Sequence, residues 1–257
     1  MPGTDDVNIH IINQCANCFC LPASTKVNID CVGNFLEAWN TSITADPLLI
    51  NQTFNLDTIF DDGFQIRQLP KDLADFYLRC VQRDTYVDDP FEGFENASYK
   101  EKYIRNRQFS QWALDGKPPQ IYQELADAFQ ALAQPLMRLY QHGRDVTQNQ
   151  ITLMKAKPGY CMGWHEDIAD NSSFIGFVYL VSDELTAEDG GQLEIARVRR
   201  DAQGGVTDRE SIACITPTNG MLILMENQTT RFHHRVLHHN THKERFLITI
   251  NMGSNGE

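Results

Sequence analysis

Residues Phe177–Ile195 read FVYLVSDELTAEDGGQLEI, and this stretch decides the predicted fold. An apolar run rich in β-branched and aromatic residues is followed by an acidic turn, the pair Gly190-Gly191 and a second apolar run. Runs of this kind between turn residues are typical of β-strands, and the two glycines permit a tight turn where the second strand starts. The stretch therefore predicts two strands joined by a turn.

Similar short runs recur outward from this stretch, at a spacing of about ten residues. They are Gln150–Lys155, Phe174–Val181, Gln192–Val198, Ser211–Ile215, Met221–Met225 and Arg245–Asn251. Many short strands at this spacing favour a sandwich or barrel over alternating strands and helices. We therefore expect a mainly β core with helices packed against one sheet.

The chain before residue 148 has a different character. Apolar residues at three- and four-residue steps predict a helix over Pro118–His142, with a kink or division at Pro135. Shorter helices are predicted at Val32–Trp39 and Lys71–Val81, and the acidic, aromatic stretch Asp84–Ala97 is predicted to be a covering loop.

Composition excludes several classes of protein. The 257 residues include 22 Lys and Arg against 34 Asp and Glu, a formal charge of −12, so a general nucleic-acid binder is disfavoured. The basic and aromatic stretch Tyr99–Trp112 is interpreted as a helix or loop over the active site, with a nucleic-acid patch as the alternative. No apolar run approaches the ~20 residues of a membrane span, and the start of the chain lacks a signal pattern, so we expect a cytoplasmic protein without a membrane segment. The seven cysteines are expected to be free thiols, although Cys15 and Cys18 have the spacing of a metal or redox pair.

Two histidine-containing segments carry the predicted chemistry. His165-Glu166-Asp167 places a histidine and a carboxylate two positions apart, so that both can point to one side of an extended segment. His233-His234 lies further along the chain. Two histidines and one carboxylate on one face of a metal ion, with positions left open, are the ligand set of non-haem Fe(II) oxygenases.

The order of these motifs resembles that of the Fe(II)/2-oxoglutarate-dependent dioxygenases, particularly the prolyl-hydroxylase-like branch. The resemblance covers about residues 150–252 and rests on PGYCMGWHED at 158–167, the stretch at 177–195, TPTNGMLILM at 216–225, HHRV at 233–236 and ERFLITINM at 244–252. It implies a double-stranded β-helix, a jelly-roll or cupin-like core over 149–257. Residues 1–148 would supply the helical, supporting and substrate-covering part of a single domain over 1–257.

The resemblance assigns the metal ligands residue by residue. His165 and Asp167 match its HxD motif. His234 matches the distal ligand because His234-Arg235-Val236 fits the HxV pattern, whereas His233 is the competing assignment. Related halogenases have a small residue in place of this aspartate, so Asp167 favours hydroxylation, or desaturation or cyclisation by the same intermediate, over chlorination.

The resemblance also assigns the co-substrate site. Arg245 matches the basic residue that holds the distal carboxylate of 2-oxoglutarate, a role that suits the bidentate hydrogen bonds of a guanidinium. Tyr179 resembles a position that binds the same carboxylate, and Thr249, on the same strand face as Arg245, would add a hydroxyl.

The implied reaction uses Fe(II), 2-oxoglutarate and O₂, with ascorbate as a further candidate cofactor, and releases succinate and CO₂. The expected substrate is a small molecule such as a free amino acid, whose amine Glu166 and Asp170 would hold. The alternatives are a prolyl or other side chain of a polypeptide, and a non-catalytic jelly-roll protein that binds or senses a metal. His238, His239 and His242 are interpreted as an exposed hairpin loop, with a second metal site as the alternative.

Overall fold

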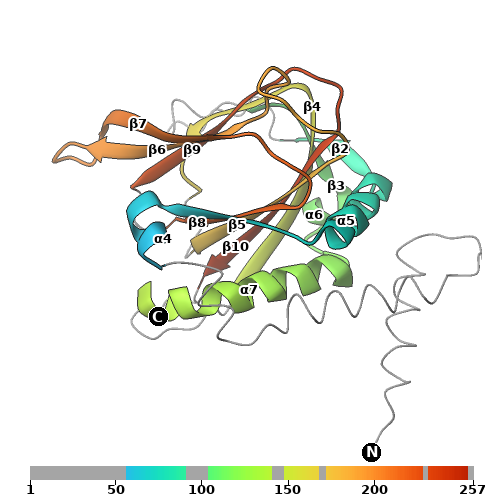
Figure 1. The fold of residues 1–257 in the computed structure, drawn as a ribbon, viewed down its shortest axis with the longest axis horizontal. Helices are drawn as coiled ribbons and strands as arrows, with labels where there is room; N and C mark the ends of the chain where they lie inside the picture. The colour runs from blue at the N-terminus through green and yellow to red at the C-terminus, as the bar shows by residue number, and fades with distance from the viewer. Residues whose placement is uncertain (1–55, 91–103, 141–147, 168–171, 228–230, 254–257) are drawn as a thin grey trace, which may run out of the picture.

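The computed structural model describes residues 56–90, 104–140, 148–167, 172–227 and 231–253 (Figure 1). The helices are α4 (Leu56–Asp62), α5 (Lys71–Arg83), α6 (Gln111–Leu114) and α7 (Gln120–Tyr140). The strands are β1 (Phe64–Gln68), β2 (Tyr86–Asp88), β3 (Ile104–Ser110), β4 (Gln148–His165), β5 (Ser172–Val181), β6 (Leu193–Arg200), β7 (Val206–Ile215), β8 (Met221–Glu226), β9 (Phe232–His239) and β10 (Arg245–Gly253). Val32–Trp39, Cys15, Cys18 and Asp170 lie outside the described residues.

All strand pairs are antiparallel, and the strand order is β1-β8-β5-β10-β4-β9-β6-β7, with β3 beside β4 and β2 beside β3. The long strand β4 pairs with β10 along its first part and with β9 along its last part, with register shifts between Tyr160 and His165. Figure 1 shows that the sheet curls into a half-barrel around this strand. The predicted mainly β, jelly-roll-like core flanked by helices is confirmed.

Strand β10 divides its side chains between two cores. Leu247 and Thr249 face the interior of the half-barrel, and Phe246 and Ile248 face the helices. Because both faces are covered, the strand is buried along almost its whole length, which explains its nearly continuous apolar sequence.

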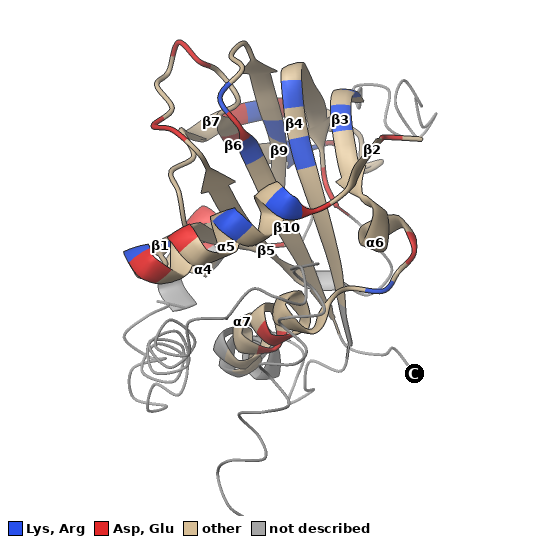
Figure 2. Cartoon of the chain, turned by 90° about the vertical axis from the view of Figure 1, so that its right-hand side faces the viewer, with Lys and Arg blue, Asp and Glu red and all other residues tan. Residues whose placement is uncertain are grey.

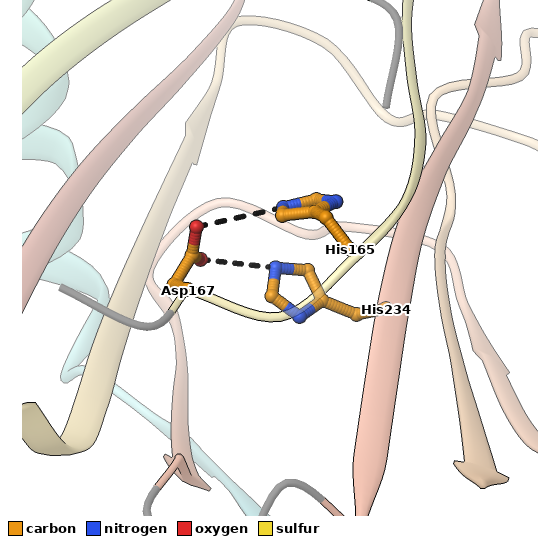
Figure 3. Close-up of side chains that lie close together, drawn as sticks. All are labelled: His165, Asp167 and His234. Carbon is orange, nitrogen blue, oxygen red and sulfur yellow. Dashed lines mark ion pairs between the residues drawn. The ribbon is translucent and has the colours of Figure 1, made fainter. Parts of the chain in front are cut away.

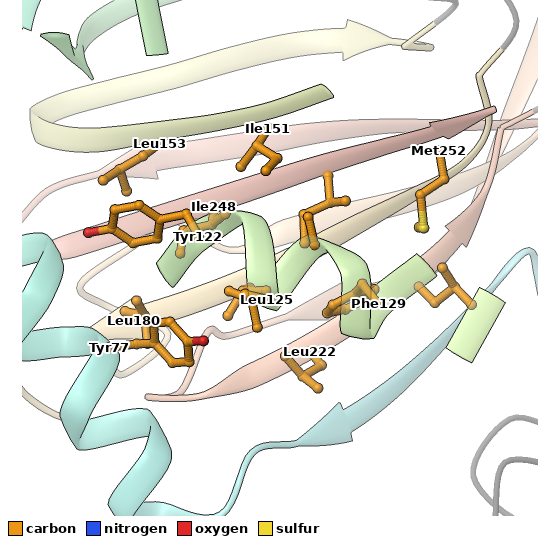
Figure 4. Packing of buried hydrophobic residues seen from close by; sticks show 14 of the residues in the cluster. Tyr77, Tyr122, Leu125, Phe129, Ile151, Leu153, Leu180, Leu222, Ile248 and Met252 are labelled. Atoms are coloured by element: carbon orange, nitrogen blue, oxygen red, sulfur yellow. The ribbon is translucent and has the colours of Figure 1, made fainter. Parts of the chain in front are cut away.

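Helices α5 and α7 cover the outer face of the sheet. Figure 4 shows this outer core, and its labelled members are Tyr77, Tyr122, Leu125, Phe129, Ile151, Leu153, Leu180, Leu222, Ile248 and Met252. Gly176 on β5 lets α7 approach closely, because a Cβ there would lie 2.7 Å from Cε1 of Phe129. The helical periodicity of both segments thus reflects burial against the sheet.

Several predictions for the first half are tested by these elements. The helix at Lys71–Val81 is confirmed. The division at Pro135 is wrong, because α7 continues to Tyr140; proline removes one helical hydrogen bond, and a helix packed along a sheet tolerates that loss. The described part of Tyr99–Trp112 is mainly strand β3, followed by the first residues of helix α6, and strand β2 lies within Asp84–Ala97.

Basic residues of β3 and β4 lie close to acidic ones on the side drawn in Figure 2. Lys155 pairs with Glu244 at 2.7 Å, and Lys157 pairs with Asp88 at 2.8 Å. These pairs balance charge locally instead of building a continuous basic face. None of the helices in the described ranges combines the length and apolar character that a membrane crossing needs.

Candidate functional site

Three potential metal ligands meet where β4 ends beside β9. His165 is the last residue of β4 and lies opposite His234 of β9, and the chain leaving β4 brings the Asp167 carboxylate to one side of the two rings, facing both (Figure 3). Asp167 Oδ1 lies 3.7 Å from His165 Nε2, and Oδ2 lies 3.2 Å from His234 Nε2. One ligand atom from each residue lies within 4.8 Å of the other two.

A backbone contact sets the orientation of the His165 ring. His165 Nδ1 lies 2.7 Å from the carbonyl oxygen of Gly163. Because a carbonyl only accepts, Nδ1 donates to it, and Nε2 is left facing the Asp167 carboxylate, where a neutral ring offers its lone pair. A lone pair facing a carboxylate oxygen is unfavourable by itself and favourable around a shared cation. The donor set therefore fits a divalent metal, and the Gly163 carbonyl fixes its first ligand.

His233 faces away from this cluster. Arg209 Nε donates to its Nδ1 at 3.2 Å, and Glu166 Oε2 lies 3.5 Å from its Nε2. Burial, with added repulsion from Arg209 and Arg200, lowers the pKa of His233 to about 4. The structure thus places His234 rather than His233 beside His165 and Asp167. Glu166 pairs with Arg200 at 2.8 Å, so its carboxylate is already engaged.

A cavity of about 200 Å³ lies inside the half-barrel next to the cluster. Its walls are mostly apolar, from residues such as Ile104, Phe109, Met154, Met162, Leu193, Val236 and Leu247. The polar residues in these walls include His165, Asp167, His234, Arg107, Thr152 and Thr249. The hydroxyls of Thr152 and Thr249 are hydrogen-bonded to each other. Such a cavity joins a potential metal site to a largely apolar interior.

Arg245 lies beyond one end of the cavity and is only 1% exposed. Its guanidinium carbon is 5.0 Å from the ring centre of Tyr179 and 5.5 Å from that of Tyr160, and both tyrosines line the cavity. No described residue forms a hydrogen bond with Arg245 Nε, Arg245 Nη2 or Tyr179 Oη. Burial raises the pKa of Tyr179 to about 12, against the opposing effect of the Arg245 charge, so the hydroxyl remains a donor. Unpaired buried donors beside a cation fit a carboxylate ligand.

A second buried arginine lies in the same row of the sheet. Ala156 of β4 pairs with Arg245 on one side and with Arg107 of β3 on the other. Asp89 accepts from Arg107 Nε at 2.8 Å and from Nη2 at 2.6 Å, which balances the charge of Arg107. Of the two, only Arg245 has buried donors that lack a partner.

The sequence-predicted residues therefore fall into two groups. His165, Asp167 and His234 meet in one cluster, and Arg245 and Tyr179 meet at one end of the cavity. Thr249 lines the same cavity but lies four residues along β10 from Arg245.

Sequence reasoning missed other residues around the cavity. Tyr160 lies in PGYCMGWHED at 158–167, five residues before His165, and this closeness to the HxD motif is a signal that it lies near the site. Arg107 and Asp89 come together because β2 pairs with β3. No short sequence pattern predicts this pairing.

Comparisons with known proteins agree with this geometry. Residues 150–253 match the family described as the 2OG-Fe(II) oxygenase superfamily. No curated protein is significantly similar in sequence to this chain. A prolyl-4-hydroxylase from Pseudomonas putida has a similar structure, with a TM-score of 0.53 and 18% identity over 80% of this chain and 100% of that chain. A prolyl hydroxylase from Trichoplax adhaerens, in complex with a peptide fragment of the hypoxia inducible factor oxygen degradation domain, has a TM-score of 0.56 and 16% identity over 80% of this chain and 89% of that chain.

The family match covers the segment that carries the metal cluster, the cavity and Arg245. The two solved structures share its fold. Residues 150–253 thus match the 2OG-Fe(II) oxygenase superfamily, which makes the protein an oxidoreductase, and this match together with the cluster of His165, Asp167 and His234 implies Fe(II) and 2-oxoglutarate as its cofactors.

Proposed function

We propose that this oxygenase hydroxylates an unactivated C–H bond of a small, amino-acid-like molecule. The observation that carries the proposal is the 200 Å³ cavity, which has the His165, Asp167 and His234 cluster in its wall and Arg245 beyond one end. Drug-sized ligands occupy pockets of about 300–1,000 Å³. A smaller cavity that must also take 2-oxoglutarate leaves room for a compact substrate or for the reacting part of a larger one.

In this proposal, Arg245 and Tyr179 hold the distal carboxylate of 2-oxoglutarate. Arg245 Nε and Nη2 and the Tyr179 hydroxyl are buried donors without partners in the described structure, and a carboxylate would accept hydrogen bonds from such donors. Asp89 balances the charge of Arg107, and no carboxylate among the described residues forms an ion pair of this kind with Arg245. Arg245 is therefore the better anion site of the two.

Thr249 is proposed for the opposite end of the co-substrate. It lies next to Phe177 in the register of β10 with β5, and the Phe177 ring lies 5.6 Å from the His234 ring. Its hydroxyl is hydrogen-bonded to that of Thr152, and both threonines line the cavity together with the three clustered residues. We assign it to the wall around the metal-chelating end of 2-oxoglutarate.

When bound, Fe(II), 2-oxoglutarate and O₂ supply the oxidising power: one oxygen atom enters the C–H bond, and the other leaves in succinate as CO₂ is released. His165, Asp167 and His234 would hold the metal, and the mostly apolar walls of the cavity would limit the access of water to it. As a third protein ligand, Asp167 would take the place that chlorination needs for a halide, which favours hydroxylation.

Succinate formation tests the assignment of the site. The protein is loaded with Fe(II) without oxygen, given 2-oxoglutarate and exposed to O₂, and succinate is measured over time. His165→Ala and Arg245→Gln are expected to abolish or strongly reduce succinate. His238→Ala and Arg199→Gln replace exposed residues of the same types and are expected to behave as wild type. Succinate formation that survived in His165→Ala would refute the metal assignment.

A second candidate function is hydroxylation of a side chain in a polypeptide. It is favoured by the structural similarity to the Trichoplax adhaerens enzyme, whose structure contains a peptide. A panel of free amino acids and a panel of peptides separate the two candidates by stimulation of succinate formation and by the mass of one added oxygen atom. Stimulation by peptides alone would replace the small-molecule proposal with this one.

A further inference from the structure

His239 lies deep in the protein, contrary to its prediction as part of an exposed hairpin loop. It is the last residue of β9, is 0% exposed, and pairs with Tyr160 of β4, which lines the cavity. The prediction failed because polar LHHNTHKER resembles a loop, although β9 extends three residues into it. The neighbouring His238 is exposed, as alternation along a strand requires.

The hydrogen bonding of His239 fixes which nitrogen carries its proton. Nε2 lies 3.0 Å from the carbonyl oxygen of Lys243, and because a carbonyl only accepts, Nε2 is the donor. Burial and the positive charge of Arg245 lower the pKa of His239, which favours the neutral ring. Nδ1 is then a lone-pair acceptor, and it is buried without a hydrogen-bond partner among the described residues.

Arg245 borders the same small space as this nitrogen. A Cβ on Gly191 would lie 3.0 Å from His239 Nδ1, 3.3 Å from Arg245 Cδ and 3.5 Å from Arg245 Nε. Gly191 has a φ of 73° and no side chain, so this space stays open. An acceptor without a partner, His239 Nδ1, thus lies near a donor without a partner, Arg245 Nε.

We propose that His239 is a positioning residue for 2-oxoglutarate that acts through Arg245. Arg245 Nε donates to His239 Nδ1 when the co-substrate binds, which fixes the plane of the guanidinium and leaves its two terminal nitrogens for the distal carboxylate. A guanidinium is planar and forked, so one contact at Nε orients both remaining donors. This inference rests on the proposed role of Arg245.

Calorimetric binding of two keto acids tests the proposal in protein loaded with Mn(II) instead of iron, so that no turnover is needed. 2-Oxoglutarate has the distal carboxylate, and 2-oxopentanoate has the same chain length without it. His239→Leu is expected to weaken the binding of 2-oxoglutarate about tenfold, as loss of a hydrogen bond to a charged group does. The affinity for 2-oxopentanoate is expected to stay unchanged. Equal weakening of both ligands would mean a purely structural role and would overturn the proposal. His238→Leu is the control.

Two further variants identify the nitrogen that matters. His239→Asn retains an acceptor near the position of Nδ1, and His239→Gln retains a donor near Nε2. The proposal expects tighter 2-oxoglutarate binding in His239→Asn than in His239→Gln, and the reverse order would contradict it. This comparison also decides the matter if His239→Leu does not fold.

A double-mutant cycle separates this inference from the proposed function. In an Arg245→Gln background, replacing His239 with Leu is expected to cause no further loss of 2-oxoglutarate affinity. If Arg245→Gln itself bound 2-oxoglutarate as tightly as wild type, the proposed role of Arg245 would fail. If only His239→Leu were without effect in the wild-type background, the present inference alone would fail.

Discussion

At the scale of single residues, the Tyr179 hydroxyl is available to bind a ligand, and its lack of a hydrogen-bond partner destabilises the ligand-free protein. It is fully buried beside Arg245 and has no hydrogen-bond partner among the described residues. A buried polar group left unsatisfied costs about 1–3 kcal/mol. Stability and co-substrate affinity should therefore respond in opposite directions when this oxygen is removed.

Tyr179→Phe is expected to leave the ligand-free protein as stable as wild type or slightly more stable, and to weaken 2-oxoglutarate binding about tenfold. Urea unfolding measures the first effect, and calorimetry in the presence of Mn(II) measures the second. Tyr86→Phe is a matched control, because the Tyr86 hydroxyl donates to the Val81 carbonyl at 2.8 Å. That variant should lose stability and retain 2-oxoglutarate affinity.

The metal ligands could be predicted from sequence because each lies in a short local motif. His165 and Asp167 need only the alternation of an extended chain to point the same way, and the HxV pattern selects His234. His239 could not be predicted in this way. Its burial depends on the turn at Gly190-Gly191 folding over the end of β9, a contact between distant segments.

At the scale of elements, the ion pair between Arg107 and Asp89 links strand β3 to the residue that follows strand β2. The Asp89 side chain is 0% exposed and that of Arg107 is 9% exposed. Removing one partner of a buried pair leaves an uncompensated charge, which typically costs about 3–5 kcal/mol.

Arg107→Met is therefore expected to destabilise the protein by about 3–5 kcal/mol in urea unfolding. Arg105→Met, on the same strand but exposed, should change stability little. The double variant Arg107→Met with Asp89→Leu should recover part of the loss, because no buried charge then remains. A double variant less stable than Arg107→Met would contradict this explanation.

The strand pattern predicted β4, β5, β6, β7, β8 and β10, but it missed β1, β2, β3 and β9 and shortened β4 and β7. The pair Pro158-Gly159 resembles a break in a strand, so the sequence predicted a strand over Gln150–Lys155 only. In the structure, β4 continues through this point as a bulge, where Gly159 has a φ of 85° and lies opposite Asn106 with a φ of 55°. Pro158 and Gly159 therefore bend β4 at the bulge and do not end the strand.

At the scale of the whole molecule, the metal cluster joins the two halves of the curled sheet. Its ligands come from the end of β4 and from β9, so a bound cation links segments that are paired only through irregular register. A ligand that binds only the folded protein stabilises it by about 2.7 kcal/mol at a hundred times its Kd.

Mn(II) is accordingly expected to raise the thermal midpoint, and 2-oxoglutarate is expected to raise it further only when Mn(II) is present. Removal of the metal with a chelator should reverse both shifts. Differential scanning calorimetry checks these shifts, and Asp167→Ala should show neither. A full 2-oxoglutarate shift in Asp167→Ala would show that the co-substrate binds away from the cluster.

The long strand β4 also has a consequence for the order of events during synthesis. His165 and Asp167 leave the ribosome well before His234, and the three ligands meet only after β9 has paired with the end of β4. The nascent chain therefore exposes an incomplete metal site until most of the catalytic segment has been translated. A site with all three ligands therefore cannot exist before His234 has been synthesised, which comes after most of residues 150–253.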